Sequence, residues 1–158
     1  MGKKRGADMQ LDEISQQIIE QLQEDGRRSY GAIAKVVGLS EAGVRQRVHR
    51  MVEAGVMQVV AVTDPLRVGA HRQVMVGIRV SGPLDPVLDA LEAMPEAVYL
   101  VVCAGSYDIL CELVCSDDEE LAELLSGRIR TVPGVVSTET FVYLQLRKQT
   151  YRWRTPAS

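Results

Sequence analysis

The sequence is poor in aromatic residues and lacks any long apolar run. Aromatic side chains make up 4% of its 158 residues, whereas hydrophobic residues make up 46%. We therefore expect buried cores that are filled by aliphatic side chains. A transmembrane helix needs a continuous apolar stretch of about 18 residues or more, and the sequence contains none, so we expect no membrane association.

Cysteine is also scarce, with only Cys103, Cys111 and Cys115. An odd number of cysteines, in a chain whose start is positively charged but has no apolar stretch behind it, predicts free thiols in a cytoplasmic protein. On a strand, the spacing from Cys111 to Cys115 corresponds to about 13 Å, which is too long for two ligands of one metal ion. We expect small buried residues there, and neither a metal nor another cofactor.

Charge is distributed unevenly, although the net charge is only −3. Residues 1–55 carry nine Lys and Arg and eight Asp and Glu, a net of +1, whereas residues 56–158 carry nine and thirteen, a net of −4. Arg45, Arg47 and Arg50 cluster within the first part. A local basic face on an acidic protein predicts moderate, salt-sensitive affinity for nucleic acid and several copies that bind together.

Residues 29–52 read SYGAIAKVVGLSEAGVRQRVHRMV, two short helical patterns separated by Gly38. Ala34, four positions before the glycine, is small enough to let the two helices approach closely. Gly38 can adopt the left-handed conformation at the turn, which costs other residues about 1–2 kcal/mol. Val44 can then pack the second helix onto the first. This spacing is typical of a helix-turn-helix, which places one helix in a DNA major groove.

An apolar stripe predicts a further helix before this unit, with Asp12 as its cap and Asp25-Gly26 at its end. Ser29 and Ser40 are predicted to cap the second and third helices. Residues 56–62, VMQVVAV, are expected to form a short strand or wing after Gly55. The residues expected to face the core are Leu11, Ile14, Ile18, Ile19, Leu22, Ala32, Ile33, Val36, Val37, Val44, Val48, Met51 and Val52.

The outer face of the third helix is the predicted DNA-reading surface. We assign to base edges Glu41, Ala42, Arg45, Gln46 and His49, and to phosphates Arg47 and Arg50. The predicted DNA-binding set is completed by Ser29, Tyr30 and Ser40. Two alternatives remain open: the face belongs to a three-helix protein-binding module, or His49 is an ordinary polar surface residue.

After residues 63–70, the apolar residues alternate instead of following helical spacing. Strands are predicted over 73–80, 98–104, 109–115 and 135–146, with helices that begin at Asp85-Pro86 and at a capping box over 116–119. This order is typical of a ferredoxin-like βαββαβ domain with an antiparallel sheet. The predicted fold class is α+β, an N-terminal winged helix-turn-helix (all-α) followed by this ferredoxin-like domain.

Two helices can cover only one face of such a sheet. The other face would leave Val, Leu and Ile side chains in water, and a second copy of the domain is the simplest cover. We therefore predict a two-fold symmetric homodimer, which also supplies two reading helices for a pseudo-palindromic site in double-stranded DNA.

These patterns divide the chain into five predicted segments. They are a disordered arm over 1–10, a helix-turn-helix domain over 11–57, a linker over 58–70, an effector-binding and oligomerisation domain over 71–147, and a basic tail over 148–158. The role of the tail stays open between an extra nucleic-acid contact and an end that docks Trp153 on a neighbouring subunit.

The ordered set of motifs resembles the Lrp/AsnC (feast/famine) family of transcription regulators over about residues 10–148. The resemblance rests on DGRRSYGAIAKVVGLSEAGVRQRVHRMVEAGV at 25–56, DPLRVGA at 64–70, AGSYDIL at 104–110 and VPGVVSTET at 132–140. One departure is Ser15, where the first helix of the family often has an aspartate, at a position we expect on the helix surface.

The resemblance implies a regulator whose DNA binding or assembly responds to a small amino acid or related metabolite bound between dimers, and assembly to a tetramer or octamer. Carried onto this sequence, the implied effector-binding residues are Gly105, Ser106, Tyr107, Asp108, Thr138 and Thr140. A Gly-Ser turn can offer backbone amides to a carboxylate, and Asp108 can pair with an ammonium group. The alternative is a β-turn with a structural aspartate and two ordinary strand threonines.

An enzyme is the second function class, because sirohaem decarboxylases resemble this family in both domains. Their chemistry needs histidines and arginines that converge on a large pocket. This chain has only His49 and His71, and the first lies on the predicted reading helix. We therefore predict a DNA-binding regulator and not an enzyme.

Overall fold

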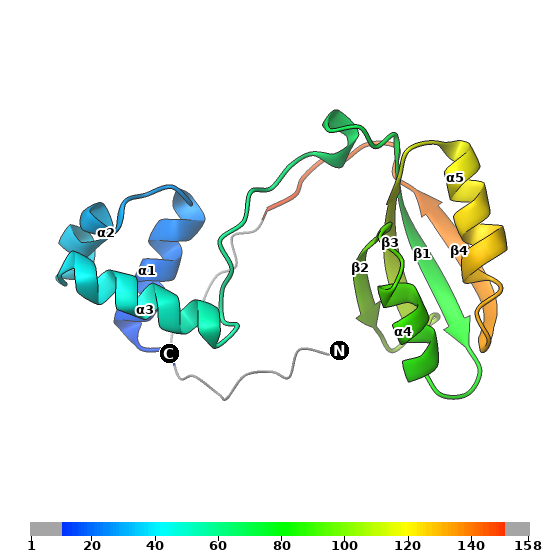
Figure 1. The fold of residues 1–158 in the computed structure, drawn as a ribbon, viewed down its shortest axis with the longest axis horizontal. Helices are drawn as coiled ribbons and strands as arrows, with labels where there is room; N and C mark the ends of the chain where they lie inside the picture. The colour runs from blue at the N-terminus through cyan, green and yellow to red at the C-terminus, as the bar shows by residue number, and fades with distance from the viewer. Residues whose placement is uncertain (1–10, 151–158) are drawn as a thin grey trace. The chain divides into compact units, whose positions relative to one another are not determined.

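The computed structural model describes residues 11–150, so the predicted arm at 1–10 and the tail beyond residue 150 lie outside the described residues. The chain divides into two compact units between Ala61 and Val62 (Figure 1). The first unit is helical, and the second contains a four-stranded antiparallel sheet. An α+β fold, with a helix-turn-helix followed by a βαββαβ domain, is thereby confirmed.

Polar side chains cap the three helices of the first unit, α1 (Glu13–Glu24), α2 (Tyr30–Val37) and α3 (Glu41–Glu53). Each cap accepts a hydrogen bond from the backbone N–H three residues later: Asp12 from Ser15 at 2.9 Å, Ser29 from Ala32 at 3.2 Å, and Ser40 from Gly43 at 3.1 Å. Gly38 has a φ of +71° and donates to the carbonyl of Ala34. The predicted caps and the predicted left-handed turn are therefore confirmed.

The core of the first unit is aliphatic. It consists of Ile18, Ile19, Ile33, Ala34, Val44, Val48 and Met51. Three residues that we expected inside lie outside it: Ala32 and Val36 on α2 are exposed, and Val52 on α3 keeps 42% of its surface exposed. α2 is only eight residues long and packs with the side that carries Ile33 and Ala34, so Ala32 and Val36, four residues apart, share the outer side.

The strand or wing predicted after α3 is wrong. Residues 57–64 form neither helix nor strand, and Val59, Val60 and Val62 are exposed. The valines favour an extended conformation, but a strand also needs a hydrogen-bonding partner, and no described segment pairs with this one. A short 3-10 helix, Pro65–Arg67, follows before the sheet begins.

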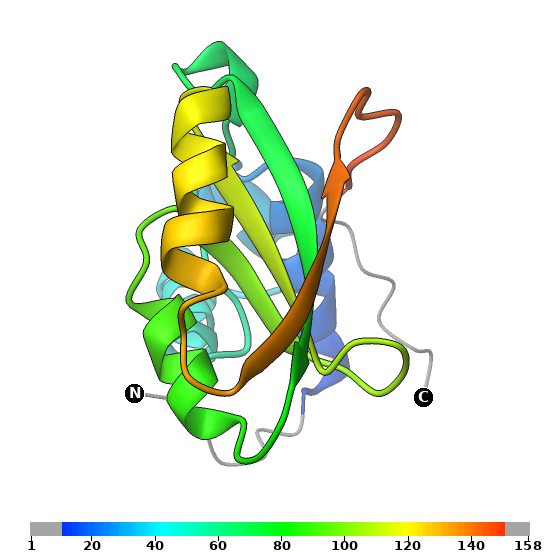
Figure 2. The same cartoon turned by 90° about the vertical axis from the view of Figure 1, so that its right-hand side faces the viewer.

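The second unit has the predicted strand-helix-strand-strand-helix-strand order. Its elements are β1 (Arg72–Val80), α4 (Asp85–Glu92), β2 (Ala97–Val102), β3 (Ile109–Cys115), α5 (Asp118–Glu123), continued as a π-helix over Leu124–Ile129, and β4 (Val135–Val142). The strands are arranged in the order β2-β3-β1-β4 with antiparallel pairing throughout. Figure 2 shows α4 and α5 on the same face of the sheet.

Besides shifts of one or two residues at the ends of β1 and β2, two boundaries in this unit differ from the prediction. The cap of α5 is Asp117 and not Ser116, because Asp117 accepts from the N–H of Glu120, while the Glu120 carboxylate accepts from the N–H of Ser116. The last strand ends at Val142 and not at Leu146. In the segment that follows Val142, Leu144 is 95% exposed. Both errors concern element ends, where local signals repeat at neighbouring positions.

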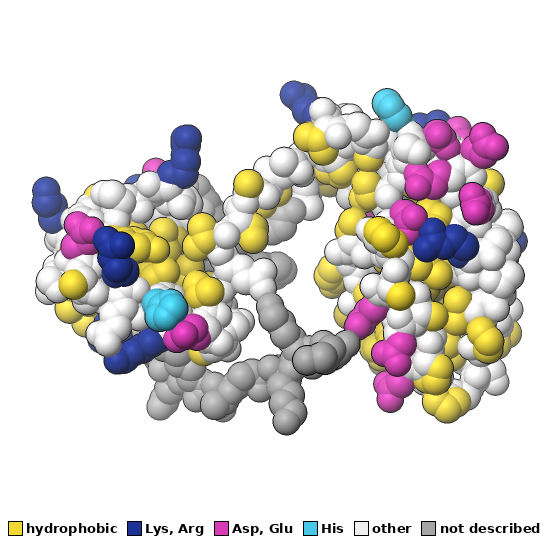
Figure 3. All heavy atoms as spheres, in the orientation of Figure 1, with side chains coloured by type: hydrophobic (Ala, Val, Ile, Leu, Met, Phe, Trp, Pro, Cys, Tyr) yellow, Lys and Arg dark blue, Asp and Glu magenta, His cyan; other side chains and the backbone are white. Residues whose placement is uncertain are grey.

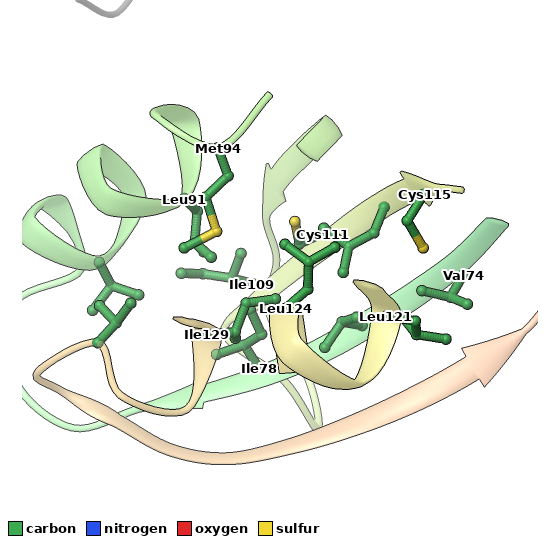
Figure 4. Packing of buried hydrophobic residues seen from close by; sticks show 14 residues of the cluster. Val74, Ile78, Leu91, Met94, Ile109, Cys111, Cys115, Leu121, Leu124 and Ile129 are labelled. Atoms are coloured by element: carbon green, nitrogen blue, oxygen red, sulfur yellow. The ribbon is translucent and has the colours of Figure 1, made fainter. Parts of the chain in front are cut away.

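The main core lies between the helices and the sheet. Val74, Val76 and Ile78 of β1 are fully buried in it, as the alternation predicted. Figure 4 shows how strands and helices contribute to this cluster, whose labelled members are Val74, Ile78, Leu91, Met94, Ile109, Cys111, Cys115, Leu121, Leu124 and Ile129. Cys111 and Cys115 are therefore packing residues, and burial raises the pKa of the Cys111 thiol to about 11.

The face of the sheet opposite the helices carries both apolar and polar side chains. Because directly paired residues share a face, the strand register places there Gln73, Met75, Gly77, Arg79, Tyr99, Val101, Leu110, Glu112, Val114, Ser137, Glu139 and Phe141. Tyr99 and Phe141 are 52% and 45% exposed. We call this surface the open face.

Candidate nucleic-acid interface and effector site

The outer side of α3 borders an open groove with a volume of about 580 Å³. Its lining comes from α3, from the start of α2 and from the segment after α3: Tyr30, Ala42, Arg45, Gln46, Val48, His49, Val52 and Val59. Figure 3 shows basic, acidic and hydrophobic side chains close together over α3. Four of the residues predicted to reach base edges, Ala42, Arg45, Gln46 and His49, thus line one groove.

Arg45 is held by two neighbours on this surface. Its Nη2 donates to Oε1 of Glu41 at 2.9 Å, one helical turn earlier on α3. Its guanidinium also lies over the ring of Tyr30, 5.6 Å from the ring centroid. Both side chains of the ion pair are more than half exposed, so the guanidinium remains open to a ligand.

His49 and Arg50 lie further along the same helix. His49 Nε2 is 3.2 Å from Oε1 of Glu53, and both side chains are well exposed. Arg50 is also exposed. Of the predicted cap residues, Ser29 and Ser40 are exposed and use their hydroxyl groups within their own helix starts.

Arg47 differs from Arg45 because its partners lie at the start of α1. Its Nη1 donates to Oδ2 of Asp12 at 2.7 Å and to Oγ of Ser15 at 3.1 Å. Hydrogen bonds from Ser15 and Arg47 lower the pKa of Asp12 to about 2. Arg47 therefore connects α3 to the start of α1, and its phosphate contact stays a prediction. Ser15 is only 1% exposed, so its predicted place on the helix surface is wrong.

The turn between β2 and β3 is fastened to β1. The N–H of Asp108 donates to the carbonyl of Ile78 at 3.0 Å, and Oδ2 of Asp108 accepts from the N–H of Val80 at 2.8 Å. That contact lies at the irregularity between Arg79 and Val80, where the pairing of β1 with β4 shifts register. The Asp108 carboxylate thus has a structural partner, while Gly105 and Ser106 at the tip of the turn are exposed.

The Tyr107 ring lies on the open face, directly above Gly77. A Cβ atom at Gly77 would be 2.7 Å from the ring, so only glycine at this position leaves room for the Tyr107 ring. The ring also meets Phe141 edge to face, with centroids 6.3 Å apart, and lies 5.9 Å from the guanidinium carbon of Arg79. Sequence reasoning missed Gly77, Arg79 and Phe141, although a glycine inside an alternating strand is itself a signal of close approach.

Thr138 and Thr140 lie on the other face of the sheet. They pair with Ile78 and Val76, whose side chains point to the helices. Oγ1 of Thr138 accepts from Nε of Arg130 at 3.1 Å, beside a pocket of about 300 Å³. The structure therefore places the threonines and the Tyr107 ring on opposite faces and does not bring the six implied effector residues together within one chain.

The open face also has a polar cluster that sequence reasoning missed. Nε2 of Gln73 donates to Oε1 of Glu112 at 2.9 Å. Burial, together with the charge of Glu112 and a hydrogen bond to it, raises the pKa of Tyr143 to about 12. Spacing alone could not have paired these residues, because they come from β1, β3 and the segment after β4.

Among residues 11–150, no group of three or more histidine, cysteine, aspartate and glutamate side chains is placed to hold a metal ion. In the same part of the chain, no helix has both the length and the apolar character that crossing a membrane requires.

Two family models match this chain. The AsnC-type helix-turn-helix domain matches residues 11–52, and the Lrp/AsnC ligand binding domain matches residues 73–153. The first match covers α1, α2 and α3 except its last residue, and the second covers the sheet, except the first residue of β1, together with α4 and α5.

Individual relatives agree with these matches. The HTH-type transcriptional regulator FL11 of Pyrococcus horikoshii is 32% identical over 142 residues, which cover 89% of this chain and 93% of the relative. The solved leucine response regulatory protein of Mycobacterium tuberculosis is 29% identical, with a TM-score of 0.82 and coverage of 92% and 100%.

A more distant structure shares the fold. It is the complex of a Neisseria meningitidis transcriptional regulator with L-methionine, which is 20% identical, with a TM-score of 0.81 and coverage of 92% of this chain and 97% of the other. With both domain models matched in order and relatives aligned over most of its length, the chain belongs to the Lrp/AsnC family of helix-turn-helix transcriptional regulators.

Proposed function

We propose that this regulator reads double-stranded DNA through the outer face of α3. The observation that carries the proposal is the groove in which Ala42, Arg45, Gln46 and His49 converge. An arginine, a glutamine and a small apolar residue are side chains that suit guanine, adenine and the thymine methyl group. Arg50 is exposed on the same helix and is the proposed phosphate contact.

The proposed functional unit is a homodimer that joins through the open face. Exposed Tyr99 and Phe141 and the adjacent Met75 and Leu110 favour burial against a second copy. The polar cluster of Gln73, Glu112 and Tyr143 would have to be satisfied in the same interface. A dimer supplies two α3 helices, which suits a pseudo-palindromic operator.

The proposed effector is a small amino acid or a related metabolite. A regulator with the same fold has been crystallised with L-methionine, and a closer one is named for its response to leucine. In this chain the turn at Gly105–Asp108 and the threonines of β4 face different sides of the sheet. A site that uses both therefore needs more than one chain, which supports a location between dimers in a tetramer or octamer.

We also propose that the protein acts in the cytoplasm and is not an enzyme. Relatives such as FL11 of Pyrococcus horikoshii and AsnC of Escherichia coli are named as regulators, which favours a regulator over a sirohaem decarboxylase. His49 pairs with Glu53 on the DNA-reading face, and His71 belongs to the other compact unit. Adding sirohaem under reducing conditions should therefore leave the absorption spectrum of the haem unchanged.

DNA binding by α3 can be tested with labelled duplexes of random sequence. Arg50→Ala should weaken binding to all sequences by a similar factor. It should also reduce the slope of log affinity against log salt concentration by about one, because one phosphate contact fewer releases one counterion fewer. Arg67→Ala, which removes an exposed arginine outside the helix-turn-helix, is the matched control. Equal losses in the two variants would contradict a phosphate contact at Arg50.

The effector class can be tested by thermal-shift screening of amino acids and their keto acids. A true ligand at 100 times its Kd should add about 2.7 kcal/mol to the free energy of unfolding. If no compound raises the melting temperature, while duplex DNA still binds, the proposed effector class is wrong and the DNA-reading role is unaffected.

A further inference from the structure

Glu41 is an unexpected residue on a surface proposed to approach DNA. It belongs to the first turn of α3, and its side chain is 57% exposed. A carboxylate there repels phosphates, so it reduces the sequence-independent part of DNA affinity. Its position on the helix start is favourable for the helix dipole, but that benefit does not require contact with Arg45.

Three neighbouring residues give this carboxylate a defined place. Oε1 of Glu41 accepts from Nη2 of Arg45 at 2.9 Å. Oε2 of Glu41 lies 3.1 Å from the point where a Cβ atom at Gly31 would be. The carboxylate therefore packs against α2 at Gly31, where the helix has no side chain. Tyr30, next to Gly31, supplies the ring that lies near the Arg45 guanidinium.

We propose that Glu41 and Tyr30 are positioning residues that hold Arg45 for a two-bond contact with guanine. This inference rests on the proposed DNA-reading role of α3. It also revises the assignment of Glu41 and Tyr30 as direct DNA contacts, because both act through Arg45. If Arg45 reads guanine in each subunit of a dimer, the DNA that this regulator binds is an operator with a guanine in each half-site.

The geometry suits this contact because a guanidinium carries five N–H donors. The bond to Glu41 is made by Nη2, and further donors remain for the O6 and N7 acceptors of guanine. A free arginine side chain can adopt many rotamers and can bind any phosphate within reach. An arginine held between a carboxylate and a ring loses less freedom when it meets the base, which favours discrimination over general affinity.

Folding stability cannot reveal this role. An exposed ion pair between residues four apart on a helix contributes little to stability, whether or not it also positions a side chain. The informative readout is the penalty for altering one guanine. Replacement of guanine by 7-deazaguanine removes the N7 acceptor and leaves Watson–Crick pairing intact.

The experiment first selects a preferred duplex with the unaltered full-length protein. Affinities are then measured for that duplex and for copies in which each guanine in turn is 7-deazaguanine. The unaltered protein should lose about fivefold or more in affinity at one guanine of each half-site, and Arg45→Ala should show no penalty there. Tyr30→Leu should lose most of the penalty, and Glu41→Gln, which keeps a carbonyl acceptor but loses the charge, should lose part of it. Tyr30→Phe, which keeps the ring, should retain the penalty.

The control for Glu41→Gln is Glu24→Gln. Glu24 lies on α1, is also exposed, and also pairs with an arginine four residues away, Arg28, at 3.0 Å. Both substitutions remove one negative charge, so both can strengthen binding to all DNA. Only Glu41→Gln should also reduce the 7-deazaguanine penalty.

Two results would overturn the inference. A full penalty in Glu41→Gln and Tyr30→Leu would show that neither residue positions Arg45, and an unchanged penalty in Arg45→Ala would show that Arg45 does not read guanine. Failure of the underlying function looks different, because the unaltered protein would then select no duplex at all.

Discussion

Asp12 makes a pH-dependent contribution to stability at the scale of a single residue. Hydrogen bonds from Ser15 and Arg47 lower its pKa from 3.8 to about 2, so the folded protein holds the charged form more strongly than the unfolded chain does. The resulting stabilisation is present above about pH 4 and is lost as the pH falls towards 2. Asp12→Asn keeps a capping side chain but removes this charge.

Urea unfolding between pH 6 and about pH 2 measures the effect. The free energy of unfolding of the unaltered protein should exceed that of Asp12→Asn at neutral pH, and the difference should shrink between about pH 4 and pH 2. Arg47→Ala should remove part of the same pH dependence. A difference that stays constant over this range would contradict the ion pair.

Asp108 combines a structural contact with a proposed effector contact, and two substitutions separate them. Asp108→Ala removes the acceptor for the N–H of Val80, so it should lower the free energy of unfolding by about 1–2 kcal/mol. Asp108→Asn keeps a carbonyl acceptor and should cost less. If the carboxylate binds an effector ammonium, both variants lose the effector-induced rise in melting temperature, and both keep DNA binding. A normal effector response in Asp108→Asn would leave Asp108 with the structural role alone.

At the scale of elements, the turn between β2 and β3 depends on one glycine in β1. Gly77→Ala would place a methyl group 2.7 Å from the Tyr107 ring, and we expect a cost of about 1–3 kcal/mol from the displaced ring. In a Tyr107→Ala background the same substitution should cost much less, because the three atoms nearest to that Cβ position all belong to the Tyr107 ring. Equilibrium unfolding of the two single variants and the double variant gives the coupling free energy. Additive effects would contradict the close contact.

The sequence was informative where one local signal determines the backbone. Ser29, Ser40 and Gly38 act within their own helix ends, and the alternation in β1 places Val76 and Ile78 against the helices, so these predictions were correct. The predicted wing was wrong because pairing partners are not encoded in a segment's own propensity. The arrangement of the open face was also beyond local signals, since the strand register decides which distant residues meet there.

The candidate site was predicted in part for the same reason. Helical periodicity put Gln46 and His49 on the outer side of α3 and Arg45 at the flank of its apolar stripe, and all three line one groove. The bond from Arg47 to Asp12 was missed because the periodicity of α3 gives no information about a residue at the start of a different helix. The effector residues came from family resemblance, which does not say which face of the sheet each side chain occupies.

At the scale of the whole molecule, the proposed dimer places a second copy on the open face. Phe141→Lys places a charge at an apolar position that is 45% exposed in the single chain, so it should shift the protein from dimer to monomer in analytical ultracentrifugation. Val36→Lys, a similar change at a site on α2 that is 61% exposed, should leave the dimer intact. A Phe141→Lys protein that remains dimeric would rule out this interface.

In the proposed dimer, two α3 helices read DNA together. Selection of duplexes from a random-sequence library by the full-length protein tests it most directly. The enriched duplexes should carry two inverted half-sites whose centres are separated by about 10 base pairs or a multiple of that distance, and each duplex should be bound by a dimer. Enrichment of a single unpaired half-site, or no enrichment at all, would contradict it.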